Sequence, residues 1–232
     1  MKGPWIFLLA ACTALHLPAA ETNVYDAEIN REIPDDSAAG VISTIEVPEI
    51  PLEFVQYINV SVTLEISPGD TAFTGDLYAY LQHGDAIAVL MNRPGRTSTR
   101  QFGYDDNIAI SLTFADDGQF GDIHNYRLTL NGDDFVPVTS PLGGRWQPDG
   151  RATDPDEVVE SDPRTLTLSN FAGSDPSGDW TIYFSDLSSG GSYTLKEWSI
   201  TIATIPEPST WALLATGFAI LLTARFKPRR RP

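Results

Sequence analysis

Apolar and polar residues alternate along much of the middle of this chain. Between residues 58 and 66 every second position is apolar and the positions between them are polar, which is the period of a strand with one buried face. Shorter runs of the same kind lie at 77–81, 87–91, 110–114, 126–130, 180–184 and 198–202. Clusters of Gly, Pro, Asn and Asp separate the runs, and none keeps a helical period. We therefore expect an all-β fold, an antiparallel β-sandwich or jelly roll.

Two segments between the runs have their own signals. The residues Asn131-Gly132-Asp133 are suited to positive φ angles, so they predict a tight hairpin after a strand at 126–130. Residues 137–164 are rich in Pro, Gly and Asp and do not alternate. They predict a long loop that carries Trp146, which either makes an exposed aromatic contact or pins the loop to the domain.

The first 20 residues have the features of a signal peptide. Lys2 precedes an apolar segment at 5–11, and the small residues Ala19 and Ala20 precede Glu21. We expect cleavage by signal peptidase after Ala20. An alternative stays open, because Leu9-Ala10-Ala11-Cys12 resembles a lipobox, in which Cys12 would be lipidated. Cleavage after Ala20 would remove the chain's single cysteine and with it any disulfide or thiol chemistry.

The C-terminal end combines a proline motif, an apolar run and a basic terminus. Pro206, Glu207 and Pro208 precede an apolar segment at 211–224, which is followed by a tail at 225–232 that contains five Lys and Arg residues. The run is shorter than the roughly 20 residues of a full membrane span, so it suits a processing signal as well as an anchor.

This arrangement closely resembles the PEP-CTERM sorting signal of Gram-negative bacteria. The resemblance implies a hydrophobic helix in the inner membrane at 211–224, recognition of Pro206-Glu207-Pro208 by an exosortase-type enzyme, and transfer to the cell surface or the exopolysaccharide matrix. It divides the chain into a signal peptide at 1–20, a folded domain at 21–204 and a sorting signal at 205–232.

The domain between the two signals is strongly acidic. Residues 21–204 contain nine Lys and Arg against 30 Asp and Glu, a net charge of about −21. Such a charge repels nucleic acid and anionic membranes and keeps an exported domain in solution.

A second resemblance covers most of residues 25–203. The segment at 170–186 and the final strand around Trp198 are similar to the end of a P domain (P/Homo B domain), the module that follows the catalytic domain in proprotein convertases and many subtilisin-like proteases. Further similar segments are Ile33-Pro34-Asp35-Asp36, Thr74-Gly75-Asp76-Leu77, Phe114 with Asp116-Asp117, and 145–150. The chain departs from the pattern at Tyr193 and at 189–192, which puts in doubt any metal site at that edge. The resemblance implies a sandwich without the catalytic domain.

Catalytic signatures are missing from the sequence. Only His83 and His124 lie in the domain at 21–204, and neither is near a nucleophile-elbow pattern. The sequence has no zinc-protease, phosphate-loop or dinucleotide motif. We therefore expect a protein that is not an enzyme.

Calcium is the cofactor that the composition favours. Hard cations take six to eight oxygen ligands from carboxylates and turn carbonyls, and paired aspartates recur in the predicted turns. Asp116 and Asp117 are the first candidates. Asp76 and Asp186, at strand ends, are expected to cap backbone N–H groups, and Trp180 and Trp198 are expected in the core.

Three functions fit these observations. The first is an exported, non-catalytic sandwich that acts as a structural or binding protein of the matrix. The second is an accessory P domain that stabilises a separately encoded subtilisin-like protease. The third is a lectin-like domain that binds exopolysaccharide through an exposed aromatic platform, with Trp146 and either Tyr104 or Tyr126 as the candidates.

Overall fold

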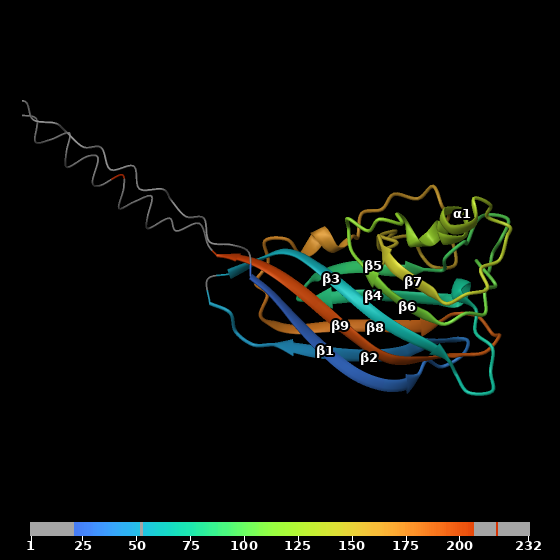
Figure 1. Cartoon of the computed structure of the whole chain (residues 1–232), viewed down its shortest axis with the longest axis horizontal. Coiled ribbons are helices and arrows are strands. Elements are labelled where there is room, and N and C mark those ends of the chain that lie inside the picture. The colour runs from blue at the N-terminus through green and yellow to red at the C-terminus, as the bar shows by residue number, and fades with distance from the viewer. Residues whose placement is uncertain (1–20, 52, 207–216, 218–232) are drawn as a thin grey trace, which may run out of the picture.

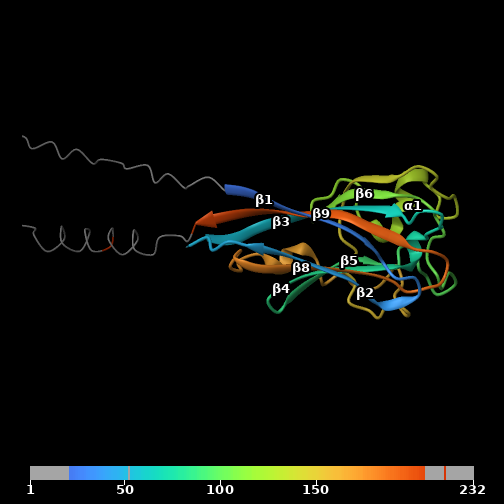
Figure 2. The same cartoon turned by 90° about the horizontal axis from the view of Figure 1, so that it is seen from below.

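Two β-sheets pack face to face in the computed structural model, which describes residues 21–51, 53–206 and 217 (Figures 1 and 2). The five-stranded sheet has the order β1-β9-β3-β6-β7 and the four-stranded sheet the order β2-β8-β4-β5. The strands are β1 (Glu21–Glu32), β2 (Ser37–Val47), β3 (Glu53–Ile66), β4 (Leu77–His83), β5 (Ala86–Asn92), β6 (Ile110–Phe114), β7 (Leu142–Trp146), β8 (Gly178–Asp186) and β9 (Tyr193–Pro206). The predicted all-β sandwich is confirmed.

The alternating runs predict most of these strands. β3 to β6, β8 and β9 contain the runs that begin at residues 58, 77, 87, 110, 180 and 198. The sequences of β1 and β2 contain no clear run of alternating apolar and polar residues. The register of β2 shifts between Ser37 and Val41, and such a bulge interrupts the alternation on which the prediction rests.

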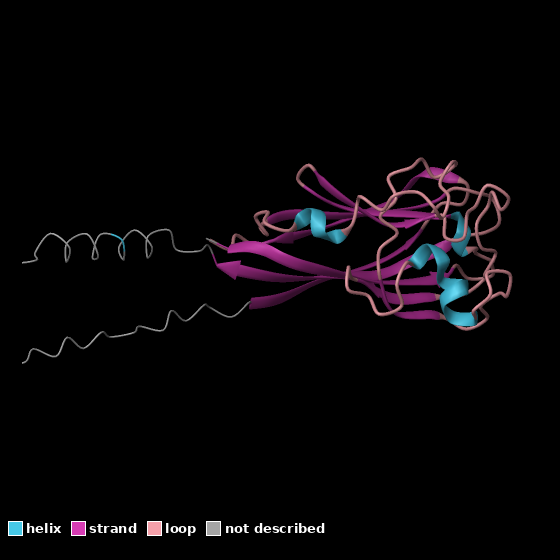
Figure 3. Ribbon diagram, turned by 90° about the horizontal axis from the view of Figure 1, so that it is seen from above, coloured by secondary structure: helices cyan, strands magenta, loops and turns pink. Residues whose placement is uncertain are grey.

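The longest pairing joins β3 to β9, from Glu53 opposite Pro206 to Ile66 opposite Tyr193. β1 pairs with the other edge of β9, and its first residue lies opposite Thr204. The start of β1 and the end of β9 therefore lie together at one end of the sandwich, and the short helix α1 (Tyr126–Asn131) lies at the other end (Figures 1 and 3).

The core lies between the two sheets and contains the two tryptophans that the sequence assigned to it. Trp180 and Trp198 are buried, and Phe171 packs against the Trp180 ring at a centroid distance of 5.0 Å. The indole nitrogen Nε1 of Trp198, on β9, donates a hydrogen bond to the hydroxyl of Ser43, on β2, at 2.9 Å. This bond links the two sheets in addition to the apolar packing.

One predicted strand is wrong. Residues 126–130 form the first turn and a half of α1, and the predicted hairpin turn is the end of this helix, where Gly132 has a φ of 70° and donates its N–H to the carbonyl of Leu128. The buried side chain of Arg127 contacts both Asp105 and Asp106. These ion pairs hold the polar side of the helix inward, and the helical form leaves the alternating leucines exposed.

The expected long loop also contains a strand. β7 pairs with β6 in parallel, with Trp146 opposite Phe114. The sequence analysis missed this strand because its residues, Leu-Gly-Gly-Arg-Trp, do not alternate between apolar and polar.

The predicted signal peptide, most of the predicted sorting motif and the apolar run at 211–224, apart from Gly217, lie outside the described residues. Pro206 is the last residue of β9. Within residues 21–51 and 53–206, no helix is long and apolar enough to cross a membrane.

Two buried aspartates lie at strand ends, as expected from the sequence. Asp186 ends β8, and its Oδ1 accepts a hydrogen bond from the backbone N–H of Ser188 at 3.3 Å. Its Oδ2 is buried without a hydrogen-bond partner among the described residues. Burial raises the pKa of Asp186 to about 7, and the charges of Asp76 and Asp35 contribute to the increase. Burial also raises the pKa of Asp76 to about 6, although Arg93 lies 3.6 Å away.

A raised carboxyl pKa destabilises the fold at neutral pH. Asp186 has a pKa near 3.8 in the unfolded chain and about 7 in the folded one, so the folded state binds more protons in between and stability falls as the pH rises through this window. At pH 8 we expect Asp186→Asn to raise the free energy of unfolding by roughly 1–3 kcal/mol, and near pH 4 to leave it about unchanged. Urea unfolding at both pH values measures this difference.

The matched control is Asp179→Asn, which changes an exposed carboxylate at the start of the same strand. We expect it to alter stability by less than about 0.5 kcal/mol. A wild-type protein more stable than Asp186→Asn at pH 8 would contradict the assignment.

Candidate functional site

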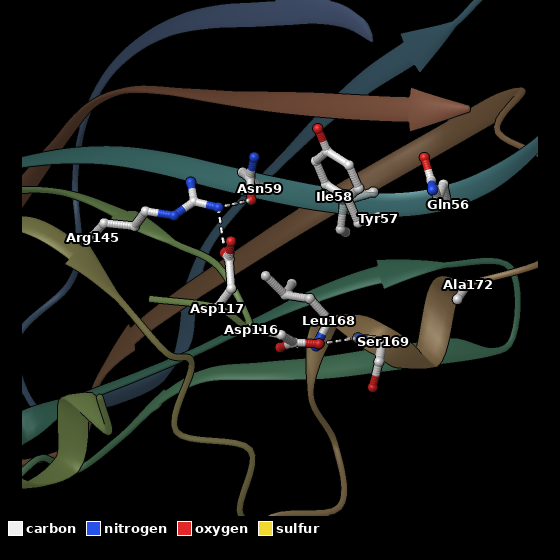
Figure 4. Close-up of a pocket in the computed structure, with 10 residues that line it drawn as sticks. All are labelled: Gln56, Tyr57, Ile58, Asn59, Asp116, Asp117, Arg145, Leu168, Ser169 and Ala172. Atoms are coloured by element: carbon white, nitrogen blue, oxygen red, sulfur yellow. Dashed lines mark hydrogen bonds and ion pairs between the residues drawn. The ribbon is translucent and has the colours of Figure 1, made fainter. Parts of the chain in front are cut away.

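A cleft of about 600 Å³ opens between β3 and the short 3₁₀ helix η3 (Leu168–Phe171) (Figure 4). Its volume lies within the usual range for small-molecule and oligomer-binding sites, about 300–1,000 Å³. The residues that line it are Gln56, Tyr57, Ile58, Asn59, Asp116, Asp117, Arg145, Leu168, Ser169 and Ala172.

The wall on β3 exists because β6 is much shorter than β3. β6 pairs with β3 only from Val60 onward, and the backbone of Val55 bonds to Gly173 and Ser174. The edge of β3 between these two contacts borders the cleft. A register shift between Val55 and Tyr57 breaks the alternation there, so that two consecutive side chains, Gln56 and Tyr57, are exposed.

Tyr57 and Ile58 have different roles in this wall. The Tyr57 side chain is 48% exposed, whereas Ile58 is buried and belongs to the core. Figure 4 shows the Tyr57 ring extending from β3 beside Gln56. The cleft thus combines an apolar base with an accessible aromatic ring at its edge.

Asp116 fixes the opposite wall. Its two carboxylate oxygens accept hydrogen bonds from the backbone N–H groups of Leu168 at 3.1 Å and Ser169 at 2.6 Å. These groups begin η3, where N–H groups have no partner within the helix. The carboxylate therefore holds a turn that is 52 residues further along the chain.

Three polar side chains from different parts of the chain close one side of the cleft. The Nη2 atom of Arg145, on β7, donates to Asn59 Oδ1 at 3.0 Å and to Asp117 Oδ1 at 2.5 Å (Figure 4). The Arg145 side chain is 36% exposed and that of Asp117 79% exposed. The two charges compensate each other at the mouth of the cleft.

The structure brings two of the sequence-predicted site residues into this cleft and excludes the third. Asp116 and Asp117 line it. Trp146 follows Arg145 on β7, but its side chain is fully buried, stacks on Phe120 at 5.1 Å and donates its N–H to the carbonyl of Gly143. The prediction that Trp146 makes a surface contact with a ligand is wrong.

The two tyrosines proposed as partners of Trp146 are also buried. Tyr104 and Tyr126 contact each other edge to face, with ring centroids 4.8 Å apart, near α1. The Tyr126 hydroxyl donates to Asp106 at 2.5 Å. Neither ring can form an aromatic platform.

Sequence reasoning missed Tyr57, Asn59 and Arg145. The break of the alternation just before Ile58 was a signal for Tyr57, because two non-alternating residues at the start of a regular strand indicate a bulge. No local pattern relates Asn59 to Arg145, since they are 86 positions apart and meet through the order of strands β3, β6 and β7.

Asp116 and Asp117, the residues predicted to bind calcium, are both hydrogen-bonded to other groups of the protein. Within residues 21–51 and 53–206, no group of three or more His, Cys, Asp or Glu side chains is placed to hold a metal ion. Calcium at Asp116 and Asp117 stays a prediction from the sequence.

The two histidines of the domain are held by structural contacts. The ring of His83 stacks on Trp180 at 4.1 Å, and its two nitrogens contact the backbone oxygens of Asp175 and Asp179. His124 is buried, with Nδ1 2.8 Å from Asp149 and Nε2 3.0 Å from the carbonyl of Arg96. Burial disfavours its charge, but the bond to Asp149 outweighs this and raises the pKa of His124. Both nitrogens face acceptors, which suits a bound proton rather than a base that activates a hydroxyl.

Comparisons with known proteins give a distant structural likeness. No protein-family model and no curated protein matches the chain. A serine protease of Aeromonas sobria in complex with its chaperone, ORF2, is 14% identical over 82% of this chain, with a TM-score of 0.44. The serine protease of Aeromonas sobria in a second structure is 13% identical over 83%, with a TM-score of 0.43. The chain spans 28% of the length of each matched chain. A likeness of this strength carries no inference about activity or partners.

Asp116 and Asp117 make different contacts, so we expect them to contribute differently to the free energy of unfolding. We expect Asp116→Ala to lower the free energy of unfolding by about 1–2 kcal/mol, because two N–H groups of η3 lose their acceptor. Asp117→Ala removes only an exposed ion pair, so we expect a loss of less than about 0.5 kcal/mol. Denaturant unfolding of both variants measures the difference, and equal losses would contradict the role of Asp116 in holding η3.

Proposed function

We propose that this chain is an exported, non-catalytic β-sandwich protein that is sorted to the cell surface or the exopolysaccharide matrix and acts there as a binding module. The observation that carries the binding role is the cleft between β3 and η3, with an exposed aromatic ring and a set of polar side chains. The observation that supports the sorting is the C-terminal sequence from Pro206 to Pro232.

Binding is favoured over catalysis by the partners of the charged groups in the cleft. Asp116 is occupied by two backbone N–H groups, and Asp117 is paired with Arg145. A general acid or base needs a perturbed pKa and an unengaged proton position. Groups that compensate each other instead provide fixed hydrogen-bonding positions.

The position of the chain ends supports a module carried by a processing signal. β9 ends at Pro206, the first residue of the motif, and the start of β1 lies beside it. The sorting sequence therefore follows the sheet directly. A membrane-embedded exosortase-type enzyme would act at the end of the sandwich from which both termini leave.

The acidic surface fits an extracellular location. A net charge of about −21 over residues 21–204 keeps the domain soluble and prevents adhesion to anionic lipids. Attachment to the matrix would then depend on the cleft and not on a general electrostatic attraction.

Sorting through the proline motif is tested in the native host with Pro206→Ala/Pro208→Ala. We expect the wild-type protein to reach the surface or the matrix in a shortened form. The variant should accumulate at full length in the inner-membrane fraction, because the processing enzyme no longer recognises it. Immunoblotting of inner-membrane, outer-membrane and extracellular fractions measures both size and location.

The control replaces two exposed prolines outside the motif, Pro48→Ala/Pro51→Ala, and should mature like the wild type. Thermal unfolding of the purified motif variant shows whether the sandwich is intact. If the motif variant has the same size and distribution as the wild type, the sorting proposal is wrong.

A further inference from the structure

The cleft contains two carboxylates and one guanidinium, and each of these three groups is engaged by another group of the protein. The carboxylate of Asp117 and the guanidinium of Arg145 are 2.5 Å apart, and both oxygens of Asp116 accept backbone hydrogen bonds. A free cation in the cleft would attract an anionic ligand, and a free carboxylate would attract a metal ion or an amine. Because the single cation is paired and both oxygens of Asp116 are occupied, the arrangement favours a ligand without charge.

The hydrogen-bonding capacity of the cleft exceeds what the protein uses. Arg145 bonds through Nη2 only, and in the described part of the chain no acceptor contacts its Nη1 or Nε. The side-chain amide of Gln56 and the Nδ2 of Asn59 also have no partner among the described residues. Both donors and acceptors are present along this edge, since Asp117 has a second oxygen and Gln56 carries both kinds of group.

Hydroxyl groups match such an edge better than other neutral groups do. Each hydroxyl donates one hydrogen bond and accepts two, so neighbouring hydroxyls on a ring can contact planar amide, carboxylate and guanidinium groups at once. The side chains of Gln56, Asn59, Asp117 and Arg145 supply these groups on two adjacent walls.

Tyr57 supplies an aromatic surface beside the polar edge. Its side chain is 48% exposed, and the apolar base of the cleft below it contains Ile58 and Leu168, which are both buried. The C–H face of a sugar ring is apolar and packs on an aromatic ring, while its hydroxyls point outward to polar partners. A smaller hollow of about 440 Å³ also combines an exposed ring, Phe102, with polar neighbours, but no buried apolar side chain lines it. Phe135, which is 82% exposed, lies instead over the guanidinium of Arg100 near the α1 end.

We infer that the cleft between β3 and η3 binds a neutral, hydroxyl-rich polysaccharide chain. Tyr57 stacks on a sugar ring, and Gln56, Asn59 and Arg145 bind its hydroxyls. This inference names the ligand class of the binding module and rests on the proposed function. It assigns the carbohydrate contact to the edge of β3 and not to the buried Trp146 and its neighbours.

The test uses the purified full chain in detergent micelles and affinity electrophoresis in gels that contain one polymer each. The neutral polymers are a β-glucan, a dextran and a galactomannan, and the charged ones are alginate and chitosan. We expect retardation by at least one neutral polymer and little effect of the salt concentration, since no ion pair with the ligand is involved. We expect Tyr57→Ala to weaken the retarding interaction by about tenfold or more, and Asn59→Ala to weaken it by about threefold or more.

Phe135→Ala is the matched control, because it removes a more exposed aromatic ring at the other end of the sandwich. It should be retarded like the wild type. Circular dichroism and thermal unfolding show that each variant is folded.

Three results would overturn the inference. They are retardation by none of the neutral polymers, retardation by alginate or chitosan alone, and retardation by a neutral polymer that Tyr57→Ala does not change. None of these results bears on sorting, which is read from the location of the proline-motif variant. A protein that is sorted but not retarded would refute only the carbohydrate assignment.

Discussion

The long antiparallel pairing of β3 with β9 is the constraint on which the rest of the structure depends. It runs from Glu53 opposite Pro206 to Ile66 opposite Tyr193 and joins one of the first strands of the domain to the last. Because β9 also pairs with β1, the start of β1 and the end of β9 lie at one end of the sandwich. The pairing of β3 with β9 presents the free edge of β3 at residues 56–59, where the shorter β6 does not reach. The same pairing therefore positions both the edge of the cleft and Pro206, the last residue of β9.

The contacts of the charged groups inside the cleft are the second feature on which the proposed binding depends. Asp116 gives both of its oxygens to the amides that begin η3, and Asp117 gives one oxygen to Arg145. Both carboxylates are candidates for calcium when only the sequence is considered, because spacing does not show which backbone groups they meet. In the folded chain both are engaged by other groups of the protein in the walls of the cleft. Buried Asp186 has one carboxyl oxygen without a hydrogen-bond partner among the described residues, and burial raises its pKa.

The sequence predicted the strands whose alternation is regular and missed those that a bulge or glycine interrupts. Ile58 to Ile66 could be recognised because every second residue from Ile58 to Leu64 is buried. β7 could not, since Gly143 and Gly144 have no side chains to show a period. The segment at 126–130 alternates as a strand does, but the ion pairs of Arg127 with Asp105 and Asp106 stabilise a helix there.

The candidate site was predicted only in part, for a related reason. Asp116 and Asp117 were found because paired aspartates in a turn are visible locally, and Trp146 was misplaced because a loop was expected where β7 runs. Arg145 and Asn59 meet only through the strand order β3-β6-β7, which a single sequence does not reveal. Tyr57 depends on a register shift that is defined by pairing with β9.

Hydrogen exchange of the full chain with and without a retarding neutral polysaccharide tests the location of the binding site most directly. We expect slower exchange in the peptides that cover residues 53–61, 114–118 and 166–174, because these segments form the walls of the cleft. The α1 end of the sandwich should exchange as in the free protein. Protection confined to residues 97–105 and 126–137 would contradict the assignment of the cleft as the binding site.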